Sequence, residues 1–213
     1  MPNDRIRILL VDDHAIVRNG VRLMLSSETD IVVEGEAENA LVALRLVREH
    51  DFDVALVDIA MPGKNGLDLL RQLRTEKPKL AVLILSTYSE EVYAVRALKL
   101  GAAGYLTKDS PSAALVAAVR KAASGGKYLT AALSEKLAGM IGGGGLDTHD
   151  ALSNRELEVM KMIAAGESLV NIASALHLSP NTVTTYRSRI LEKLGMSSNA
   201  DLTRYAIENG LLT

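Results

Sequence analysis

The 213-residue sequence contains no cysteine, which excludes disulfide bonds, thiolate metal sites and thiol redox chemistry. Aromatic residues make up only 3% of the chain while hydrophobic residues make up 48%, so we expect an aliphatic core. No apolar run approaches the length that crosses a bilayer, and the N-terminus leads directly into a strand pattern without a signal peptide. We therefore expect a cytoplasmic protein with no membrane partner.

Net charge and nucleotide-binding motifs are also lacking. The formal net charge is -2 at pH 7, so overall charge gives no hint of a nucleic-acid partner. The absence of a G-x-x-x-x-G-K-[ST] segment argues against an ATP site. No histidines have the H-E-x-x-H spacing of a metal site, and we interpret all four as surface or cap residues: His14, His50, His149 and His177.

What the chain does contain is an alternation of strand-like and helix-like segments over about its first 125 residues. Strands are expected at Ile6–Val11, Ile31–Ala37, Asp53–Val57, Leu80–Leu85 and Gly104–Leu106. Helices are expected at Ala15–Leu25, Ala40–Arg48, Gly66–Arg74, Glu90–Leu100 and Ser112–Ala123. Five βα units of this kind predict an α/β fold with a doubly wound, five-stranded parallel sheet.

The rest of the chain has a different organisation. One more short helix is expected over Ala131–Ile141, and the glycines Gly142–Gly145 that follow predict a flexible linker because they cannot hold a helix cheaply. From Ser153 onward the sequence carries only helix signals. We therefore expect one domain over residues 1–125, a helical and glycine-rich linker over residues 126–148, and a small all-α domain over residues 149–213.

Three carboxylates and a lysine follow strands of the predicted sheet. Asp12 and Asp13 follow the first strand, Asp58 follows the third, and Lys108 follows the fifth. The carboxyl ends of neighbouring parallel strands share one edge of the sheet, where open α/β sheets bind ligands. Crowded carboxylates need a hard cation such as Mg2+, and the lysine could pair with an oxyanion. The set predicts a site for moving a phosphoryl group onto a carboxylate, although Asp13 could instead cap the first helix.

The C-terminal helices follow helix-turn-helix logic. Ser153 and Glu156 have the spacing of a capping box. The dipeptide Ser179-Pro180 places serine at an N-cap and proline at the first helical position. The four helices are expected at about Ser153–Gly166, Ser168–Leu176, Asn181–Leu194 and Ser198–Asn209.

The third of these helices has two distinct faces. An apolar stripe for packing on the other helices consists of Val183, Tyr186, Ile190 and Leu194. A face that suits the major groove of DNA has short polar side chains flanked by cations, namely Thr184, Thr185, Ser188, Arg187, Arg189 and Lys193. The polar face could also be only a solvated surface. Residues 151–213 carry as many acidic as basic side chains, so nonspecific attraction to DNA phosphates should be modest.

In combination these motifs resemble known families. The acidic pair, the segment Asp58-Ile59-Ala60-Met61-Pro62-Gly63 and the segment Gly101–Lys108 resemble a response-regulator receiver domain of two-component signalling. The segment from Leu152 to Gly195 resembles the LuxR-type helix-turn-helix. Apart from the linker, the chain is similar to regulators of the NarL/FixJ type, which implies a flavodoxin-like receiver followed by a DNA-binding domain.

The resemblance implies roles for individual residues. Asp58 would accept phosphate, Asp12 and Asp13 would help it hold Mg2+, and Lys108 would contact the phosphoryl oxygens. Two further positions match the family's switch residues and could otherwise be core-edge residues. They are the switch hydroxyl Ser86, with neighbouring Thr87 as the rival, and the switch aromatic Tyr105.

The implied function is a DNA-binding transcriptional regulator switched by phosphorylation. Its expected partners are a sensor histidine kinase, double-stranded DNA and, in the active state, a second copy of the chain. It would not be an enzyme beyond slow self-dephosphorylation. An aspartyl-phosphate phosphatase is disfavoured because Ala60 stands where such enzymes commonly need a second acid. A ligand-gated regulator that no longer accepts phosphate is disfavoured by the intact acid and lysine set. In the expected third helix of the C-terminal domain, Thr184 stands where many members of this family have Lys or Arg.

Overall fold

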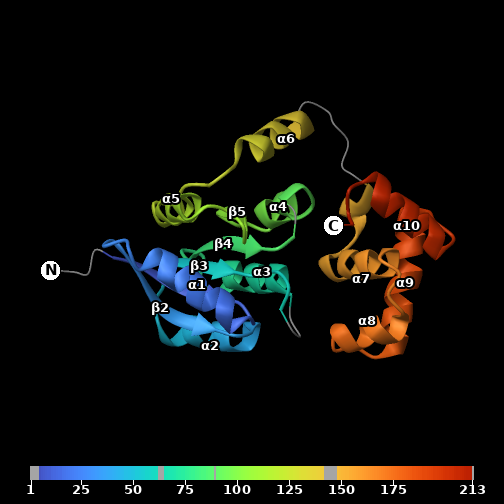
Figure 1. The fold of residues 1–213 in the computed structure, drawn as a ribbon, viewed down its shortest axis with the longest axis horizontal. Helices are drawn as coiled ribbons and strands as arrows, with labels where there is room; N and C mark the ends of the chain where they lie inside the picture. The colour runs from blue at the N-terminus through green and yellow to red at the C-terminus, as the bar shows by residue number, and fades with distance from the viewer. Residues whose placement is uncertain (1–4, 62–64, 89, 142–147, 213) are drawn as a thin grey trace. The chain divides into compact units, whose positions relative to one another are not determined.

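The computed structural model describes residues 5–61, 65–88, 90–141 and 148–212 (Figure 1). By its internal contacts the chain divides into two compact units, Met1–Gly142 and Gly143–Thr213. The expected linker glycines Gly142–Gly145 lie outside the described residues, as do Pro62 and Gly63 of the segment after Asp58. In the part of the chain that the structure describes, no helix is both long and apolar enough to cross a membrane.

The first unit is built on a five-stranded sheet. Its strands are β1 (Ile6–Val11), β2 (Ile31–Ala37), β3 (Val54–Val57), β4 (Ala81–Ser86) and β5 (Gly104–Thr107). All neighbouring strands pair in parallel, and the order is β2-β1-β3-β4-β5. This order confirms the predicted doubly wound sheet. It places the switch in strand order between β1 and β3, which is where open α/β sheets bind ligands.

Six helices accompany the sheet: α1 (Ala15–Leu25), α2 (Ala40–Glu49), α3 (Gly66–Glu76), α4 (Glu90–Lys99), α5 (Ser112–Ala123) and α6 (Ala131–Ile141). On one face, Ile8 and Leu10 share a buried cluster with side chains of α1 and α5. Because side chains alternate along a strand, Leu9 and Val11 point to the opposite face, which α2, α3 and α4 cover. Burial on both faces explains why β3 is entirely apolar and why β4 is apolar up to Ser86.

Helix α6 packs against α4, although its sequence lies in the segment that we expected to be a linker. Leu133 on α6 is buried. The hydroxyl of Thr130 accepts a hydrogen bond from the Leu133 amide (3.1 Å) and donates one to Glu90 at the start of α4 (2.6 Å). These contacts fix the start of α6 on the first unit.

The second unit is helical. A short 3-10 turn, η1 (Thr148–Ala151), precedes α7 (Asn154–Ala164), α8 (Leu169–Ala175), α9 (Pro180–Leu194) and α10 (Asn199–Glu208). The predicted capping box of Ser153 and Glu156 is present, and Gly195 ends α9 in the left-handed conformation (φ 65°) that glycine adopts at little cost. The interpretation of His149 as a surface residue was wrong, because it is buried and its amide donates to the Tyr205 hydroxyl (3.0 Å).

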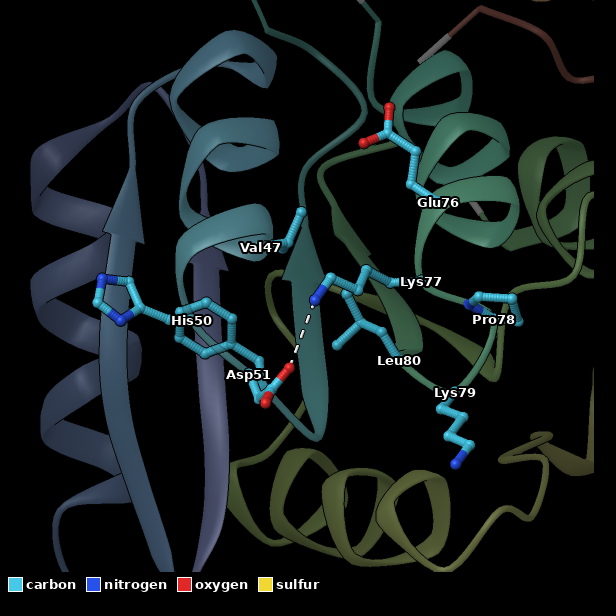
Figure 2. A pocket seen from close by; sticks show the side chains of 9 residues that line it. Val47, His50, Asp51, Glu76, Lys77, Pro78, Lys79 and Leu80 are labelled. Carbon is cyan, nitrogen blue, oxygen red and sulfur yellow. Dashed lines mark hydrogen bonds and ion pairs between the residues drawn. The ribbon is translucent and has the colours of Figure 1, made fainter.

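A cavity of about 330 Å³ opens at the amino ends of β3 and β4 (Figure 2). Its apolar lining includes Phe52 and Leu80, and an ion pair between Lys77 and Asp51 (3.4 Å) crosses its mouth. None of the predicted site residues lines this cavity. Because the cavity lies at the amino ends of β3 and β4, it is at the opposite end of the strands from Asp58, which follows β3.

Candidate functional site

The predicted acids and the lysine meet at the carboxyl edge of the sheet. The Lys108 ammonium lies 2.6 Å from Oδ2 of Asp12 and 2.8 Å from Oδ2 of Asp58. The Asp58 side chain is only 2% exposed, and those of Asp12 and Lys108 are also largely buried. The Lys108 amide donates to the Ser86 carbonyl (2.9 Å), which holds the lysine at the end of β4. The sheet thus brings together residues that are up to 96 positions apart in the chain.

Burial and charge act in opposite directions on this group. Burial raises the pKa of Asp58, and the nearby charge of Asp12 raises it further, while the hydrogen bond from Lys108 only partly offsets these effects. Burial alone would lower the pKa of Lys108, but its hydrogen bonds to Asp12 and Asp58 outweigh burial and raise that pKa. The lysine is therefore held in its charged form between two carboxylates.

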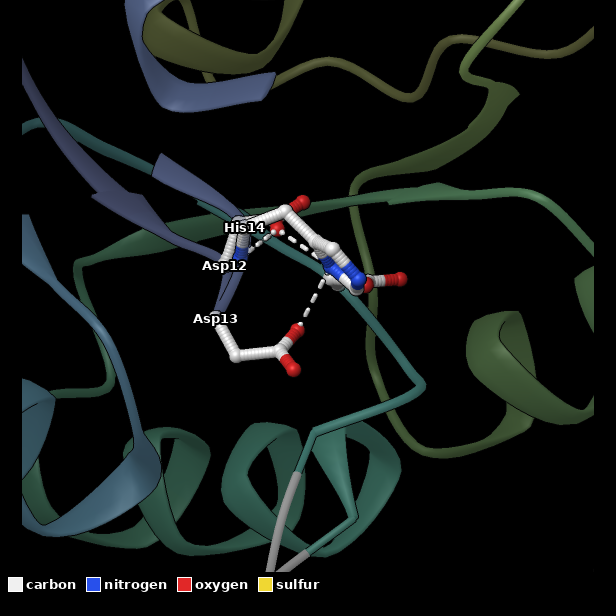
Figure 3. Close-up of side chains that lie close together, drawn as sticks. Asp12, Asp13 and His14 are labelled. Atoms are coloured by element: carbon white, nitrogen blue, oxygen red, sulfur yellow. Dashed lines mark hydrogen bonds and ion pairs between the residues drawn. The ribbon is translucent and has the colours of Figure 1, made fainter. Parts of the chain in front are cut away.

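Asp13 and His14 complete one side of the cluster (Figure 3). The imidazole Nδ1 of His14 lies 2.9 Å from Oδ1 of Asp13 and 3.4 Å from Oδ1 of Asp12. The N-cap of α1 is His14, with no side-chain cap bond, so Asp13 does not cap that helix. Candidate ligand atoms of Asp12, Asp13, His14 and Asp58 all lie within 4.8 Å of one another. Because we interpreted His14 as a surface or cap residue, we did not expect it in this cluster.

These residues fit a hard divalent cation. Oδ1 of Asp58 is buried and has no hydrogen-bond partner in the described part of the chain, and the same is true of Oδ1 of Asp13 apart from its ion pair with His14. A buried carboxylate oxygen without a partner is costly. A cation bound among three carboxylates would satisfy these oxygens, and oxygen ligands are those that Mg2+ prefers.

The backbone after Asp58 is packed closely against the start of α3. Asn65 caps α3 by accepting a hydrogen bond from the Leu67 amide (2.9 Å), and the helix begins at Gly66 as expected. A Cβ atom on Gly66 would lie 1.9 Å from the Asp58 carbonyl oxygen. Only glycine allows the helix to approach the acceptor residue so closely.

Both expected switch residues are buried beside the site. Ser86 ends β4 and is fully buried, whereas its rival Thr87 is exposed. The Tyr105 hydroxyl donates to the Tyr88 carbonyl (2.7 Å), and the Ser86 hydroxyl accepts from the Tyr88 amide (3.3 Å). Burial raises the pKa of Tyr105. The segment after β4 is thus tied to both side chains.

In the second unit, α9 presents the expected polar face. Thr184, Thr185 and Ser188 are exposed, and each hydroxyl donates to the carbonyl four residues earlier in the helix. Val183 and Ile190 on the apolar stripe are buried, and Tyr186 is half-buried. The apolar stripe therefore packs inward as predicted, and the polar face is open to solvent in this unit.

The three flanking cations differ from one another. Arg189 is exposed, and Arg187 donates to the side chain of Asn199 (2.7 Å). Lys193 pairs with the buried Glu156 (2.6 Å). Burial would raise the pKa of Glu156, but the bonds from Lys193 and Ser153 lower it. We expected Lys193 only at the DNA-binding face, and its pair with Glu156 could not be foreseen because the two residues lie 37 positions apart.

Comparisons with known proteins agree with this geometry. Residues 8–120 match the response regulator receiver domain, and residues 150–206 match bacterial regulatory proteins of the luxR family. The chain is 36% identical over 209 residues to the response regulator GacA of Pseudomonas viridiflava, covering 97% of this chain and 98% of that protein. It is 37% identical over 209 residues to the probable transcriptional regulatory protein NarL of Mycobacterium tuberculosis, covering 98% and 97%. RcsB from Salmonella enterica serovar Typhimurium, bound to promoter rprA with the phosphomimetic BeF3-, is 25% identical with a TM-score of 0.67, covering 94% of this chain and 98% of that one.

Proposed function

The chain belongs to the response regulators of the NarL/FixJ type, DNA-binding transcriptional regulators of two-component signalling, and we propose that phosphorylation of Asp58 switches it. The single observation that carries the proposal is the buried carboxylate of Asp58, which has one oxygen on Lys108 and the other without a hydrogen-bond partner among the described residues. Such a group is poised for a further ligand and for attack on an electrophile.

The proposed reaction is a substitution at phosphorus. An Asp58 oxygen attacks the phosphoryl group of a phosphohistidine on a sensor kinase, or of a small phosphodonor. The new O–P bond forms as the P–N or P–O bond of the donor breaks, and the leaving atom keeps the electron pair; a leaving nitrogen then takes up a proton from water. Lys108 is placed to stabilise the transferring oxygens.

We propose Mg2+ as the cofactor, held by Asp12, Asp13 and Asp58. When bound, the ion would offset the negative charge on the transferring group. Two contacts within the chain position the site. The backbone contact of Gly66 fixes Asp58, and the hydrogen bond from the Lys108 amide to Ser86 links the site to β4.

We propose that Ser86 and Tyr105 read the phosphorylated state. Phosphorylation adds about -1.5 to -2 charges and strong acceptor oxygens. The Ser86 hydroxyl would donate to one of those oxygens, and its bond from the Tyr88 amide would then change. Because the Tyr105 hydroxyl is tied to the same Tyr88, the movement of one residue would be felt by the other.

We further propose that α9 reads DNA. Thr184, Thr185 and Ser188 would face base edges, while Arg187 and Arg189 would bind phosphates, and Lys193 would do so only by sharing its charge with Glu156. Residues 1–125 and 149–213 would be the receiver and DNA-binding domains. The active form would be a homodimer in the cytoplasm, because a symmetric dimer contacts two half-sites about one DNA turn apart.

Beyond slow self-dephosphorylation, we propose no enzymatic turnover. Ala60, two residues after the acceptor, is small and half-buried and offers no acid or amide to direct an attacking water. Steady hydrolysis of a phosphoester by the purified chain would contradict this part of the proposal.

Replacement of Asp58 tests the assignment of the acceptor. Asp58→Asn keeps the size of the side chain and removes the nucleophilic carboxylate, so labelling by a small phosphodonor should be abolished while the circular dichroism spectrum stays unchanged. The control is Asp109→Asn, which alters an exposed carboxylate beside Lys108 and should label normally. Comparable labelling of the Asp58 variant would show that another residue accepts the phosphoryl group.

A further inference from the structure

We propose that His14 is a nitrogen ligand of the divalent cation in this site and shifts the site's preference from Mg2+ toward a first-row transition ion such as Mn2+. The proposal rests on the metal site proposed above and adds a ligand to its carboxylates. In Figure 3 the imidazole of His14 reaches back over the acidic pair, and dashed lines join it to both carboxylates.

The carboxylate oxygens divide between two neighbours. The Oδ2 atoms of Asp12 and Asp58 both contact the ammonium of Lys108 (2.6 and 2.8 Å). The Oδ1 atoms of Asp12 and Asp13 both lie close to Nδ1 of His14 (3.4 and 2.9 Å). The lysine thus contacts one oxygen of Asp12 and one of Asp58. Oδ1 of Asp12 also accepts a hydrogen bond from the His14 amide (2.8 Å), whereas Oδ1 of Asp13 and Oδ1 of Asp58 have no hydrogen-bond partner among the described residues and remain available to a cation.

A second observation marks the same place as a ligand site. Oδ1 of Asp58 is buried and has no hydrogen-bond partner among the described residues, and Asp58 belongs to the same group of candidate ligand residues as His14. Atoms bound to one ion at about 2.0–2.2 Å are at most a little over 4 Å apart. The 4.8 Å spread of the group is close to this limit, so a small inward movement of the side chains would close it.

Neither helix capping nor burial accounts for the position of the imidazole. His14 is the N-cap residue of α1, but its side chain makes no capping hydrogen bond. The side chain is 63% exposed, so burial does not hold it against the acids. An exposed imidazole beside two carboxylates is free to turn its ring nitrogen to a shared ion.

The chemistry of the nitrogen atom decides which ion benefits. Mg2+ prefers oxygen ligands and keeps several waters, so an imidazole adds little to its binding. First-row transition ions accept imidazole readily, and their affinity for mixed nitrogen and oxygen sites exceeds that of the alkaline-earth ions. A site with three carboxylates and one imidazole would therefore discriminate between Mn2+ and Mg2+ through His14.

The competing explanation is that His14 only orients Asp13 by a hydrogen bond. Residues that hydrogen-bond to a metal ligand also affect metal affinity, by about 10–100-fold. His14→Asn separates the two roles, because the asparagine amide can still donate to Asp13 but offers no imidazole nitrogen to the ion. His50→Asn is the matched control, since His50 is also exposed and lies at the opposite end of the strands.

The test measures Mn2+ and Mg2+ affinity of the full chain by calorimetry, together with electron spin-echo modulation of the bound Mn2+. The native chain and the His50 variant should show the 14N modulation of a directly coordinated imidazole. His14→Asn should lose this signal and about tenfold in Mn2+ affinity, with Mg2+ affinity within about twofold of native. Asp13→Asn should weaken the binding of both ions.

Three results would overturn the proposal. The first is absence of 14N modulation in the native chain, and the second is its persistence in His14→Asn. The third is an equal loss of affinity for both ions in that variant, which is the result expected of a positioning residue. Failure of the native chain to bind either ion would instead remove the metal site itself. The role of His14 would fall with it.

Discussion

Asp58 is a costly residue for the fold. Its carboxylate is buried, Asp12 places a second negative charge nearby, and one oxygen has no hydrogen-bond partner in the described part of the chain. The raised pKa of Asp58 expresses this cost, because folding favours its neutral form over its charged form. A cation or a phosphoryl group at this site would give this buried oxygen a bonding partner that it lacks in the free protein.

The pH dependence of Asp58→Asn follows from that shift. A carboxyl group whose pKa is raised in the folded state destabilises the fold once pH exceeds the pKa of the unfolded chain, and stability returns as pH falls. The variant lacks this group, so without added metal it should be more stable than the native chain at neutral pH. The difference should shrink as pH falls toward the range in which free aspartate titrates. Urea unfolding of both proteins over a pH series measures it, and a variant that is less stable at neutral pH would refute the argument.

Residues differ in how well the sequence predicts their roles. Asp12, Asp58 and Lys108 could be placed together because each follows a strand, and the geometry of a parallel sheet does the rest. His14 could not, because a lone histidine after a strand has no spacing that marks a ligand. The pair of Lys193 and Glu156 depends on how α9 crosses α7, which the periodicity of neither helix reveals.

Most element boundaries were predictable because the local signals agree with the packing. The strands β1 and β2 and the helices α1, α5 and α6 have the predicted bounds, and most of the others differ by one or two residues at an end. Serine caps mark the helices of the second unit, each with a hydrogen bond to the first turn. The turn η1 was missed, because its place depends on the burial of His149 against Tyr205 rather than on a local signal.

The close approach of α3 to β3 can be tested at Gly66. In Gly66→Ala the added Cβ would meet the Asp58 carbonyl oxygen at 1.9 Å, so the backbone must move, and stability should fall by about 1–3 kcal/mol. Phosphorylation should slow because Asp58 is displaced. Gly20→Ala in α1 is the matched control, since its Cβ would meet no described atom within 4 Å and should stabilise the helix by about 0.5–1 kcal/mol. Thermal unfolding and phosphodonor labelling of both variants measure these effects, and equal behaviour would disprove the steric argument.

The DNA-reading role of α9 can be tested on its polar face. Replacing Thr184, Thr185 and Ser188 together by alanine should lower specific binding more than nonspecific binding, by about 1–3 kcal/mol for each good contact. Arg189→Ala should weaken all sequences alike and reduce the salt dependence by about one unit of slope. Ser134→Ala on α6 is the control, because its hydroxyl makes the same type of bond to the helix backbone. Binding to selected DNA and to random DNA is compared over a salt series, and an unchanged sequence preference in the triple variant would exclude this face from the groove.

At the scale of the whole molecule, the account requires that the first unit control the second. The boundary between the units falls between Gly142 and Gly143, within the run Gly142–Gly145, which lies outside the described residues. We expect the unphosphorylated receiver either to cover α9, the helix that we propose reads DNA, or to keep the chain monomeric. A fragment that begins near Asp147 should then bind DNA without phosphodonor, at least at high concentration. Phosphorylation needs to shift such an equilibrium by only a few kcal/mol to change occupancy greatly.

The central claim is that phosphorylation of Asp58 controls DNA binding. Its most direct test is the affinity of the full chain for a DNA sequence that it binds specifically, measured with and without a small phosphodonor. The phosphodonor should raise the affinity of the native chain by about tenfold or more, which corresponds to about 1.4 kcal/mol. Asp58→Asn should abolish this gain, and Ser86→Ala should reduce it while still accepting phosphate. If the phosphorylated native chain binds DNA no more tightly than the unphosphorylated chain, the receiver does not control DNA binding through Asp58.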